Sequence, residues 1–231
     1  MLFRQLFDEE SHTYTYLLAD TASGEAALID PVDTHVPMYL RLLEELDLKL
    51  IVALDTHVHA DHVTGLGLLR DACGCATMVG FEGEIDCASE GLEDGKQIQV
   101  GSITLNTLFT PGHTDDSFCF TVDADDLRYL FSGDTLLIRG TGRTDFQNGD
   151  PEQLYDSLHN KLLKLPGNTR VYPAHDYKGW TVSTIEEELR TNPRLEPDSK
   201  AAFVELMNNL DLPNPKMMDV AVPANRACGK R

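Results

Sequence analysis

Three histidines and an aspartate stand close together in the segment Thr-His-Val-His-Ala-Asp-His, which begins at Thr56. Imidazole nitrogens and carboxylate oxygens are ligand atoms that zinc and iron take in proteins. His57 and His59 are two residues apart, so both side chains face the same side of an extended backbone. A single histidine at a strand end is usually a surface residue, but four ligand-type side chains so close together predict a metal site.

The elements on either side of this motif must position it. Residues 50–54 are apolar and partly β-branched, which predicts a buried strand that ends just before the motif. On the other side, the apolar residues Val63, Leu66 and Leu69 predict a helix over residues 61–72. The metal site is therefore expected at the junction between a buried strand and a helix.

Three further predicted strands also end in a residue that could bind a metal: His113, Asp134 and His175. Glycine or proline, which let the backbone turn sharply, stands close to each of them. Taken alone, each would more often be a hydrogen-bonded polar residue, but their shared position at strand ends predicts that they join one site. The remaining histidines lack this context and are expected at the surface: His12, His35 and His159.

Strand and helix patterns alternate along the rest of the chain. Strands are expected at residues 14–19, 25–29, 77–79, 97–100, 103–109, 117–122, 127–131 and 169–172. Helices are expected at residues 36–48, 151–163, 182–190 and 199–210, and the acidic segment 82–95 is expected to be a loop. Because there is no repeat or long linker, residues 1–231 are expected to form one domain.

Composition excludes several classes of partner. The net charge of −19 argues against nucleic acid and against anionic membrane surfaces. No apolar run is long enough to span a bilayer. Residues 1–10 lack the pattern of a signal or transit peptide, so a cytoplasmic location is expected. The five cysteines are odd in number and show no paired spacing, so no disulfide is expected.

The ligand-bearing segments, residues 56–62, 111–114, 132–134 and 173–175, resemble those of the metallo-β-lactamase superfamily. This resemblance implies an α/β fold of four layers, αββα, in which two mixed β-sheets are flanked by helices and a metal centre lies at one edge of the sheets. Further segments are similar to the persulfide dioxygenases of the ETHE1 type: residues 136–147, 172–177, 181–184, 192–195 and 221–225. The match covers nearly the whole chain.

Seven ligand-type residues could hold metals in two ways. In a dinuclear site, as in the hydrolases of this superfamily, His57, His59 and His113 would bind one ion, Asp61, His62 and His175 a second, and Asp134 would bridge them. The persulfide dioxygenase resemblance implies instead one Fe(2+) per chain on His57, His113 and Asp134, with three open positions. The other four, His59, Asp61, His62 and His175, would then support these ligands or leave a second metal site vacant.

The resemblance implies the oxidation of glutathione persulfide by O2 and water to sulfite and glutathione, with no protein nucleophile. Glutathione carries carboxylates, which call for cationic or hydrogen-bonding partners. Arg143 is the first candidate, followed by Arg139, Tyr177 and Lys178. For both arginines the alternative is a structural salt bridge, for example with Asp145.

The main alternative function is that of a glyoxalase II-like hydroxyacylglutathione thioesterase with a dinuclear site. Such enzymes usually have a longer C-terminal helical region, whereas only 56 residues follow His175 here. A lactonase-type hydrolase and a non-catalytic metal-binding or sulfur-carrier protein are weaker alternatives. The resemblance to persulfide dioxygenases also implies a homodimer.

Overall fold

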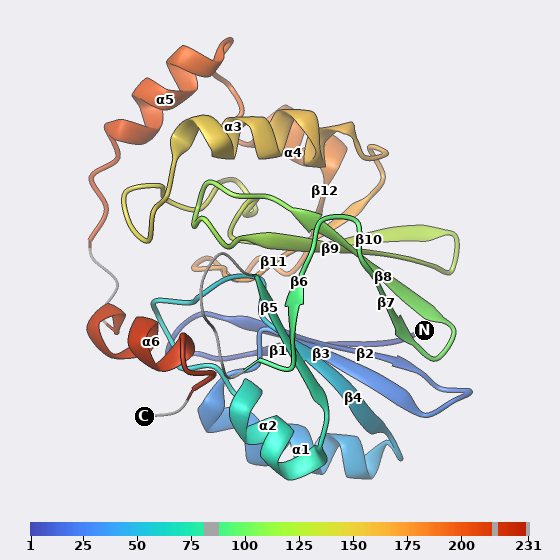
Figure 1. The fold of residues 1–231 in the computed structure, drawn as a ribbon. Helices are drawn as coiled ribbons and strands as arrows, with labels where there is room; N and C mark the ends of the chain where they lie inside the picture. The colour runs from blue at the N-terminus through green and yellow to red at the C-terminus, as the bar shows by residue number, and fades with distance from the viewer. Residues whose placement is uncertain (81–87, 214–216, 230–231) are drawn as a thin grey trace.

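The computed structural model describes residues 1–80, 88–213 and 217–229. Within these ranges the strands form two six-stranded sheets that face each other, and helices cover the outer face of each sheet (Figure 1). This is the four-layer αββα arrangement of mixed sheets that the sequence predicts.

The first sheet combines antiparallel and parallel strands. In sheet order its strands are β1 (Leu2–Phe7), β2 (Tyr14–Asp20), β3 (Glu25–Ile29), β4 (Lys49–Leu54), β5 (Ala76–Gly80) and β6 (Glu90–Leu92). Pairing is antiparallel from β1 to β3 and parallel from β3 to β6. Parallel neighbours need a crossover. The 3₁₀ turn η1 (Asp33–His35) with helix α1 (Val36–Glu45), and helix α2 (Leu66–Cys73), supply the first two crossovers and pack on this sheet.

The second sheet is mainly an antiparallel meander. In sheet order its strands are β12 (Ser183–Thr184), β11 (Arg170–Pro173), β10 (Leu127–Gly133), β9 (Phe118–Ala124), β8 (Ile103–Phe109) and β7 (Gln97–Val100). Among the strand pairs of this sheet in the described residues, only β10–β11 is parallel. The outer face is covered by α3 (Pro151–Asn160), the 3₁₀ turn η2 (Leu162–Lys164), α4 (Ile185–Thr191) and α5 (Lys200–Asn208).

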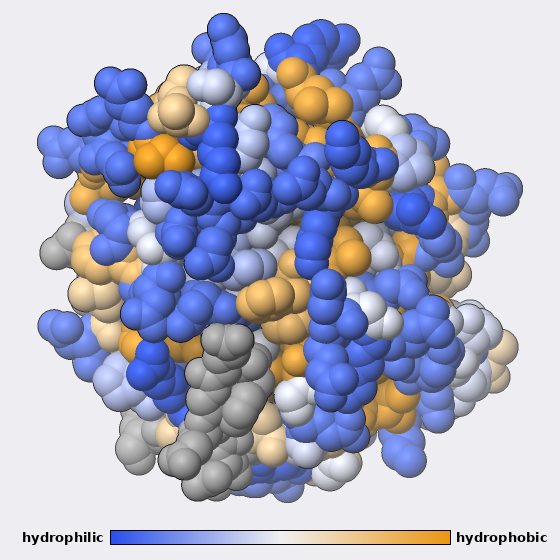
Figure 2. Space-filling model, turned by 45° about the horizontal axis from the view of Figure 1, so that its top comes forward, coloured by the Kyte–Doolittle hydropathy of each residue, from blue (hydrophilic) through white to orange (hydrophobic). Residues whose placement is uncertain are grey.

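An aromatic core fills the space between the two sheets. Tyr16 of β2 and Phe131 of β10 meet there with ring centroids 5.0 Å apart, and both side chains are almost fully buried. The Tyr16 hydroxyl donates a hydrogen bond to the main-chain oxygen of Pro173 at 2.6 Å, which ties the first sheet to the end of β11. Hydrophilic residues cover most of the face in Figure 2, with hydrophobic residues in small separate groups. The dense core fixes the relative position of the strand ends.

The helix after the metal motif begins later than the sequence predicts. Residues 61–65 are not helical, and α2 begins at Leu66. The reason lies in contacts far along the chain. Thr64 forms a β-bridge with Val32, and its main-chain N–H donates to the Asn225 side chain at 2.8 Å. These contacts hold residues 61–65 in a non-helical conformation.

Some elements were missed by the sequence patterns or differ from them. The N-terminal strand β1 was not predicted, nor was the last helix, α6 (Met218–Asn225), which contains Pro223. In the segment expected to be an acidic loop, Glu90–Leu92 is a strand paired with β5, while residues 82–87 lie outside the described ranges. The helix expected from residue 182 begins as the short strand β12.

The expectation of no disulfide is wrong for Cys228, which is disulfide-bonded. This residue follows α6 and is buried in the cluster beneath the first sheet, a position that sequence spacing did not reveal. Cys73, Cys75 and Cys119 are free. In the described parts of the chain, no helix has both the length and the apolar character needed to cross a membrane.

Candidate metal centre

All seven predicted ligand-type residues meet at one edge of the two sheets. His57 and His59 follow β4 of the first sheet, whereas His113, Asp134 and His175 follow β8, β10 and β11 of the second. Among the described residues their ligand atoms form two compact groups. The first group is His57, His113 and Asp134, and the second group is His59, Asp61, His62 and His175.

In the first group, a hydrogen bond at His113 Nδ1 leaves Nε2 as the nitrogen that could bind a metal ion. His113 Nδ1 lies 2.7 Å from the main-chain oxygen of Arg143. A carbonyl oxygen only accepts hydrogen bonds, so Nδ1 carries a proton and Nε2 is the nitrogen left to bind a metal ion. That Nε2 lies 3.6 Å from Asp134 Oδ2. His113 is therefore oriented as a metal ligand by the loop that follows Asp134.

A glycine allows this loop to fold back so closely. The N–H of Gly142 donates to the Asp134 main-chain oxygen at 2.6 Å. A Cβ at residue 142 would lie 2.7 Å from the His113 ring, nearer than real Cβ contacts come. Only glycine fits here, because a side chain would push the loop away from the imidazole that its carbonyl orients.

A relay of hydrogen bonds sets the proton of His57 in the same way. The Thr56 hydroxyl donates to Asp30 Oδ2 at 3.0 Å, so the hydroxyl oxygen can only accept at its 2.9 Å contact with His57 Nδ1. His57 therefore carries its proton on Nδ1, and Nε2 is left as the ligand atom. A second partner that orients each metal-binding histidine is the usual arrangement around protein metals.

Charge and burial also suit a cation. Burial, followed by the neighbouring His59 and His113, holds the pKa of His57 well below its usual value, so its ring is neutral. Burial acts to raise the pKa of the Asp134 carboxyl, but His175, followed by His113 and His57, lowers it below its usual value. Two imidazoles and one carboxylate whose ligand atoms all lie within 4.8 Å of one another fit a first-row metal ion.

The second group is linked internally. Asp61 Oδ2 lies 2.9 Å from both His62 Nδ1 and His175 Nε2. His175 Nδ1 lies 2.7 Å from Asp134 Oδ1, so this ring joins the carboxylates of the two groups. Within the described ranges, His59 Nδ1 and His62 Nε2 are buried without a hydrogen-bond partner. A buried nitrogen needs a partner, and a metal ion would supply one to each of these two nitrogens.

Three residues that support the centre were not singled out from the sequence: Thr13, Asp30 and Asn225. Asp30 directly follows the strand predicted at residues 25–29. Its Oδ1 accepts from the Thr56 N–H at 2.6 Å and from His59 Nε2 at 3.1 Å, and burial raises its pKa to about 6. A buried carboxylate that accepts several hydrogen bonds is a common partner of metal-binding histidines. Asp30 is far from Thr56 and His59 in the sequence, so the sequence did not reveal these contacts.

Asn225 of α6 fastens the metal-binding segment from the other end of the chain. Its Nδ2 donates to the main-chain oxygens of His59 at 2.9 Å and His62 at 2.8 Å, and its Oδ1 accepts from Thr64 N–H. The Asn225 side chain is buried, so water could not readily take over its hydrogen bonds if it were removed. In the sequence, Asn225 belongs to the segment 221–225, which is similar to the persulfide dioxygenases. That similarity did not predict a structural role for Asn225.

Replacing Asn225 by alanine is expected to lower the free energy of unfolding by about 3–5 kcal/mol, because buried groups that lose a partner cost about 1–3 kcal/mol each. Urea denaturation measures this change. Asn208→Ala, at an exposed position of α5, is the matched control and should stay within about 0.5 kcal/mol of wild type. Equal effects of the two substitutions would contradict the role of Asn225.

The two arginines proposed for substrate are bound within the chain. The Arg139 guanidinium pairs with Glu187 and Glu188. The Arg143 guanidinium makes a two-point contact with Asp145, at 2.6 and 2.7 Å, and also donates to the main-chain oxygens of Leu212 and Pro213. These contacts are the internal salt bridges given as the alternative. The guanidinium of Arg143 thus fixes the loop whose carbonyl orients His113, and its role with substrate stays a prediction.

Tyr177 and Lys178 follow the ligand-bearing end of β11 and are exposed. The Tyr177 ring lies parallel to that of His175, with centroids 6.4 Å apart, and its edge meets His12 at 5.1 Å. Tyr177 therefore lies at the solvent side of the centre, where it could contact a substrate. For Lys178 the structure gives a main-chain hydrogen bond to Asp176 and an exposed position.

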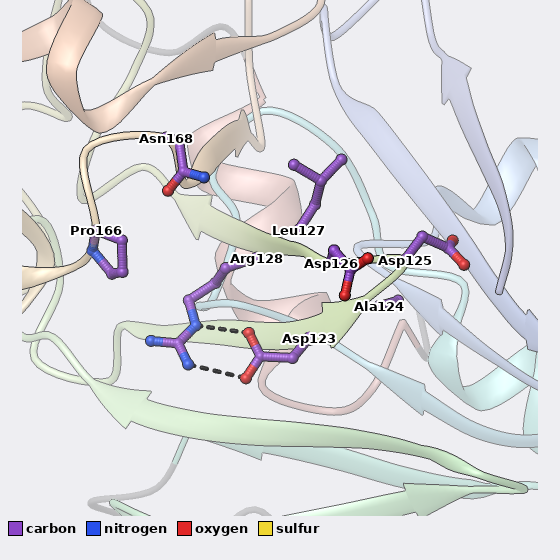
Figure 3. Close-up of a pocket in the computed structure, with 8 residues that line it drawn as sticks. All are labelled: Asp123, Ala124, Asp125, Asp126, Leu127, Arg128, Pro166 and Asn168. Carbon is purple, nitrogen blue, oxygen red and sulfur yellow. Dashed lines mark hydrogen bonds and ion pairs between the residues drawn. The ribbon is translucent and has the colours of Figure 1, made fainter.

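A surface hollow lies at the other end of β10 (Figure 3). It is lined by the hairpin between β9 and β10, and its one arginine, Arg128, is paired with Asp123. Strand β10 has seven residues and lies between this hollow and Asp134. At a rise of about 3.3 Å per residue, the distance between them is roughly 20 Å. The hollow is acidic and remote, so it is not part of the metal centre.

Comparisons with known proteins show the family of the chain. The pattern of the "Metallo-beta-lactamase superfamily" matches residues 9–82 and 89–175. The chain is 50% identical to "Persulfide dioxygenase ETHE1, mitochondrial" of Bos taurus, covering 99% of this chain and 89% of that protein. The crystal structure of ETHE1 from Myxococcus xanthus superposes with a TM-score of 0.94 at 51% identity, covering 99% of this chain and 100% of that one.

A hydroxyacylglutathione hydrolase of Pseudomonas entomophila is more distant. It is 36% identical over 81% of this chain and 70% of its own length. The resemblance predicted from the sequence is thus confirmed at both levels. The chain belongs to the metallo-beta-lactamase superfamily and, within it, to the ETHE1 family of persulfide dioxygenases.

Proposed function

We propose that this protein is an iron-dependent persulfide dioxygenase that converts glutathione persulfide, O2 and water into glutathione and sulfite. The sulfane sulfur is oxidised by four electrons and O2 is reduced by four. The sulfur–sulfur bond breaks, water supplies the third oxygen of sulfite, and two protons are released. A relative that is 50% identical over 99% of this chain is named a persulfide dioxygenase.

The observation that carries the proposal is the first group and its hydrogen bonds. The lone pairs of His57 Nε2 and His113 Nε2 and an oxygen of Asp134 converge, while Thr56 and the Arg143 carbonyl hold the opposite ring nitrogens. Two histidines and one carboxylate are the ligand set of non-haem Fe(II) oxygenases. When bound there, Fe(2+) would supply open positions for the persulfide and O2 and would mediate electron transfer from the sulfur to O2.

The chain's own residues position the ligands and control charge. His175 lies between Asp134 and Asp61 and can direct one oxygen of Asp134 away from the first group, so that the other faces His113. The pKa of His57 is held well below its usual value, which favours binding of a cation over binding of a proton at this ring. No side chain is required to form a covalent bond with the substrate. Tyr177 is the exposed residue best placed to contact the glutathione portion.

The wild-type protein is expected to contain about one iron per chain, and to consume O2 and release sulfite when glutathione persulfide is added. Anaerobic purification without added metal, metal counting, an oxygen electrode and a sulfite assay measure these properties. Chelation of the metal should stop both O2 uptake and sulfite release, and Fe(2+) should restore them. Sulfite release without O2 uptake would contradict the proposal.

The second group motivates one alternative, a hydroxyacylglutathione thioesterase with two metal ions. Its four ligand-type residues are all present, and two of their nitrogens are orphaned. Anaerobic hydrolysis of S-lactoylglutathione by a protein with two zinc ions per chain would favour this function. Absence of hydrolysis, together with oxygen-dependent sulfite release, would exclude it.

A homodimer and a cytoplasmic location stay predictions. Light scattering coupled to size exclusion would test the first. Fractionation of the source cells would test the second, which the word mitochondrial in the names of the relatives makes worth measuring.

A further inference from the structure

The hydroxyl of Thr13 lies inside the second group. Its Oγ1 is 3.1 Å from Asp61 Oδ2, 3.2 Å from His62 Nδ1 and 3.1 Å from His175 Nε2. The side chain is fully buried. Three of the four residues that would bind a second ion are thus in contact with a single hydroxyl group that comes from another part of the chain.

The surrounding structure holds this hydroxyl in place. Thr13 forms an antiparallel β-bridge with His175, which joins the start of β2 to the end of β11. Ser11 Oγ lies 2.7 Å from Thr13 Oγ1 and donates to Asp8 Oδ2 at 2.5 Å, and Asp8 also pairs with His35. A β-branched side chain has a stiff χ1. Thr13 therefore cannot rotate its hydroxyl away from the second group at low cost.

The hydroxyl competes with a metal ion for Asp61 Oδ2 and His175 Nε2. It has one proton and two lone pairs, and four polar atoms lie within hydrogen-bond distance of it, so its capacity is fully used. An ion bound by Asp61 Oδ2 and His175 Nε2 would need those atoms at about 2.0–2.2 Å. It would have to break their contacts with Thr13 and with each other. In the first group, by contrast, His57 and His113 use Nδ1 for their hydrogen bonds, which leaves Nε2 of each ring for an ion.

We propose that the Thr13 hydroxyl closes the second metal position and so holds the centre at one ion per chain. This inference rests on the proposed function, in which the iron centre has one ion. His59 Nδ1 and His62 Nε2 have no hydrogen-bond partner among the described residues. The second group therefore keeps lone pairs for an ion once the hydroxyl has been removed.

Zinc counting by equilibrium dialysis against excess Zn(2+) tests the proposal without an activity assay. Wild type and Thr13→Ser, which keeps the hydroxyl, are expected to bind one ion per chain. Thr13→Ala is expected to bind two. The double variant Thr13→Ala/His62→Ala should return to one, which distinguishes an ion in the second group from zinc held on the acidic surface. Circular dichroism and thermal unfolding confirm that each variant is folded.

A second readout reports on the distance between ions. With Mn(2+) in place of zinc, wild type and Thr13→Ser should give the resonance of isolated ions, whereas Thr13→Ala should give the broadened resonance of a coupled pair. A folded Thr13→Ala protein that still binds one ion would overturn the inference and leave the proposed function intact. A wild-type protein that binds a coupled pair would overturn both the inference and the one-iron centre.

Discussion

Replacing Asp134 by asparagine is expected to leave a folded protein that binds little iron and oxidises glutathione persulfide at least about 100-fold more slowly, since even loss of a residue behind a ligand costs about 10–100-fold. The amide is neutral, so the site loses the only carboxylate of the first group. It also places an N–H₂ group against His175 or against His113. Both effects oppose binding of a cation.

Iron content after anaerobic reconstitution, followed by the rate of sulfite release, measures the effect. Asp123→Asn is the matched control, because Asp123 is an exposed carboxylate on β9 that pairs with Arg128. It should keep wild-type iron content and rate. Oxygen consumption by the Asp134 variant at the wild-type rate would remove the first group as the site of the reaction.

Replacing Asp30 by asparagine is expected to weaken iron binding about 10–100-fold although Asp30 does not belong to the first group. Asp30 Oδ1 accepts two hydrogen bonds, so asparagine must keep its oxygen there and turn its N–H₂ toward the Thr56 hydroxyl. That hydroxyl then accepts from residue 30 and donates to His57 Nδ1. The proton of His57 moves to Nε2, which is the atom that should bind the ion.

Long-range ¹H–¹⁵N correlation spectra of the iron-free protein can identify the protonated nitrogen of His57. Wild type should carry the proton on Nδ1 and the Asp30→Asn variant on Nε2, with a parallel loss of iron in dialysis. Thr56→Val, which breaks the same relay, should weaken iron binding as well. Asp20→Asn, an exposed carboxylate in a hairpin, should change neither property. An unchanged His57 proton in the Asp30 variant would disprove the relay.

The strand ends that carry the ligands could be predicted because the signals are local. The apolar run before His57, and the glycine or proline beside His113, Asp134 and His175, each lie within a few residues of the ligand that they position. Since strands of facing sheets end at a common edge, local patterns were sufficient to predict that these residues join one site. The division into two groups was implied for the first group by the family resemblance alone. The layered fold followed from the family resemblance rather than from the patterns themselves.

The supporting contacts could not be predicted because they join distant segments. Thr13 meets His175 across the two sheets, and Asn225 reaches back to the segment before α2. The late start of that helix has the same origin, since Asn225 and Val32 hold Thr64 in a non-helical shape. The ion pairs of Arg139 with Glu187 and Glu188 could not be predicted either, because the partners lie far apart in the sequence.

The ligands of the first group come from both sheets, with His57 after β4 and the other two after β8 and β10. An ion bound by the first group would therefore link the two sheets. Because binding to the folded state alone stabilises that state, cellular iron supply would also govern how long each molecule survives. Shortage of the metal would then deplete the enzyme itself as well as its turnover.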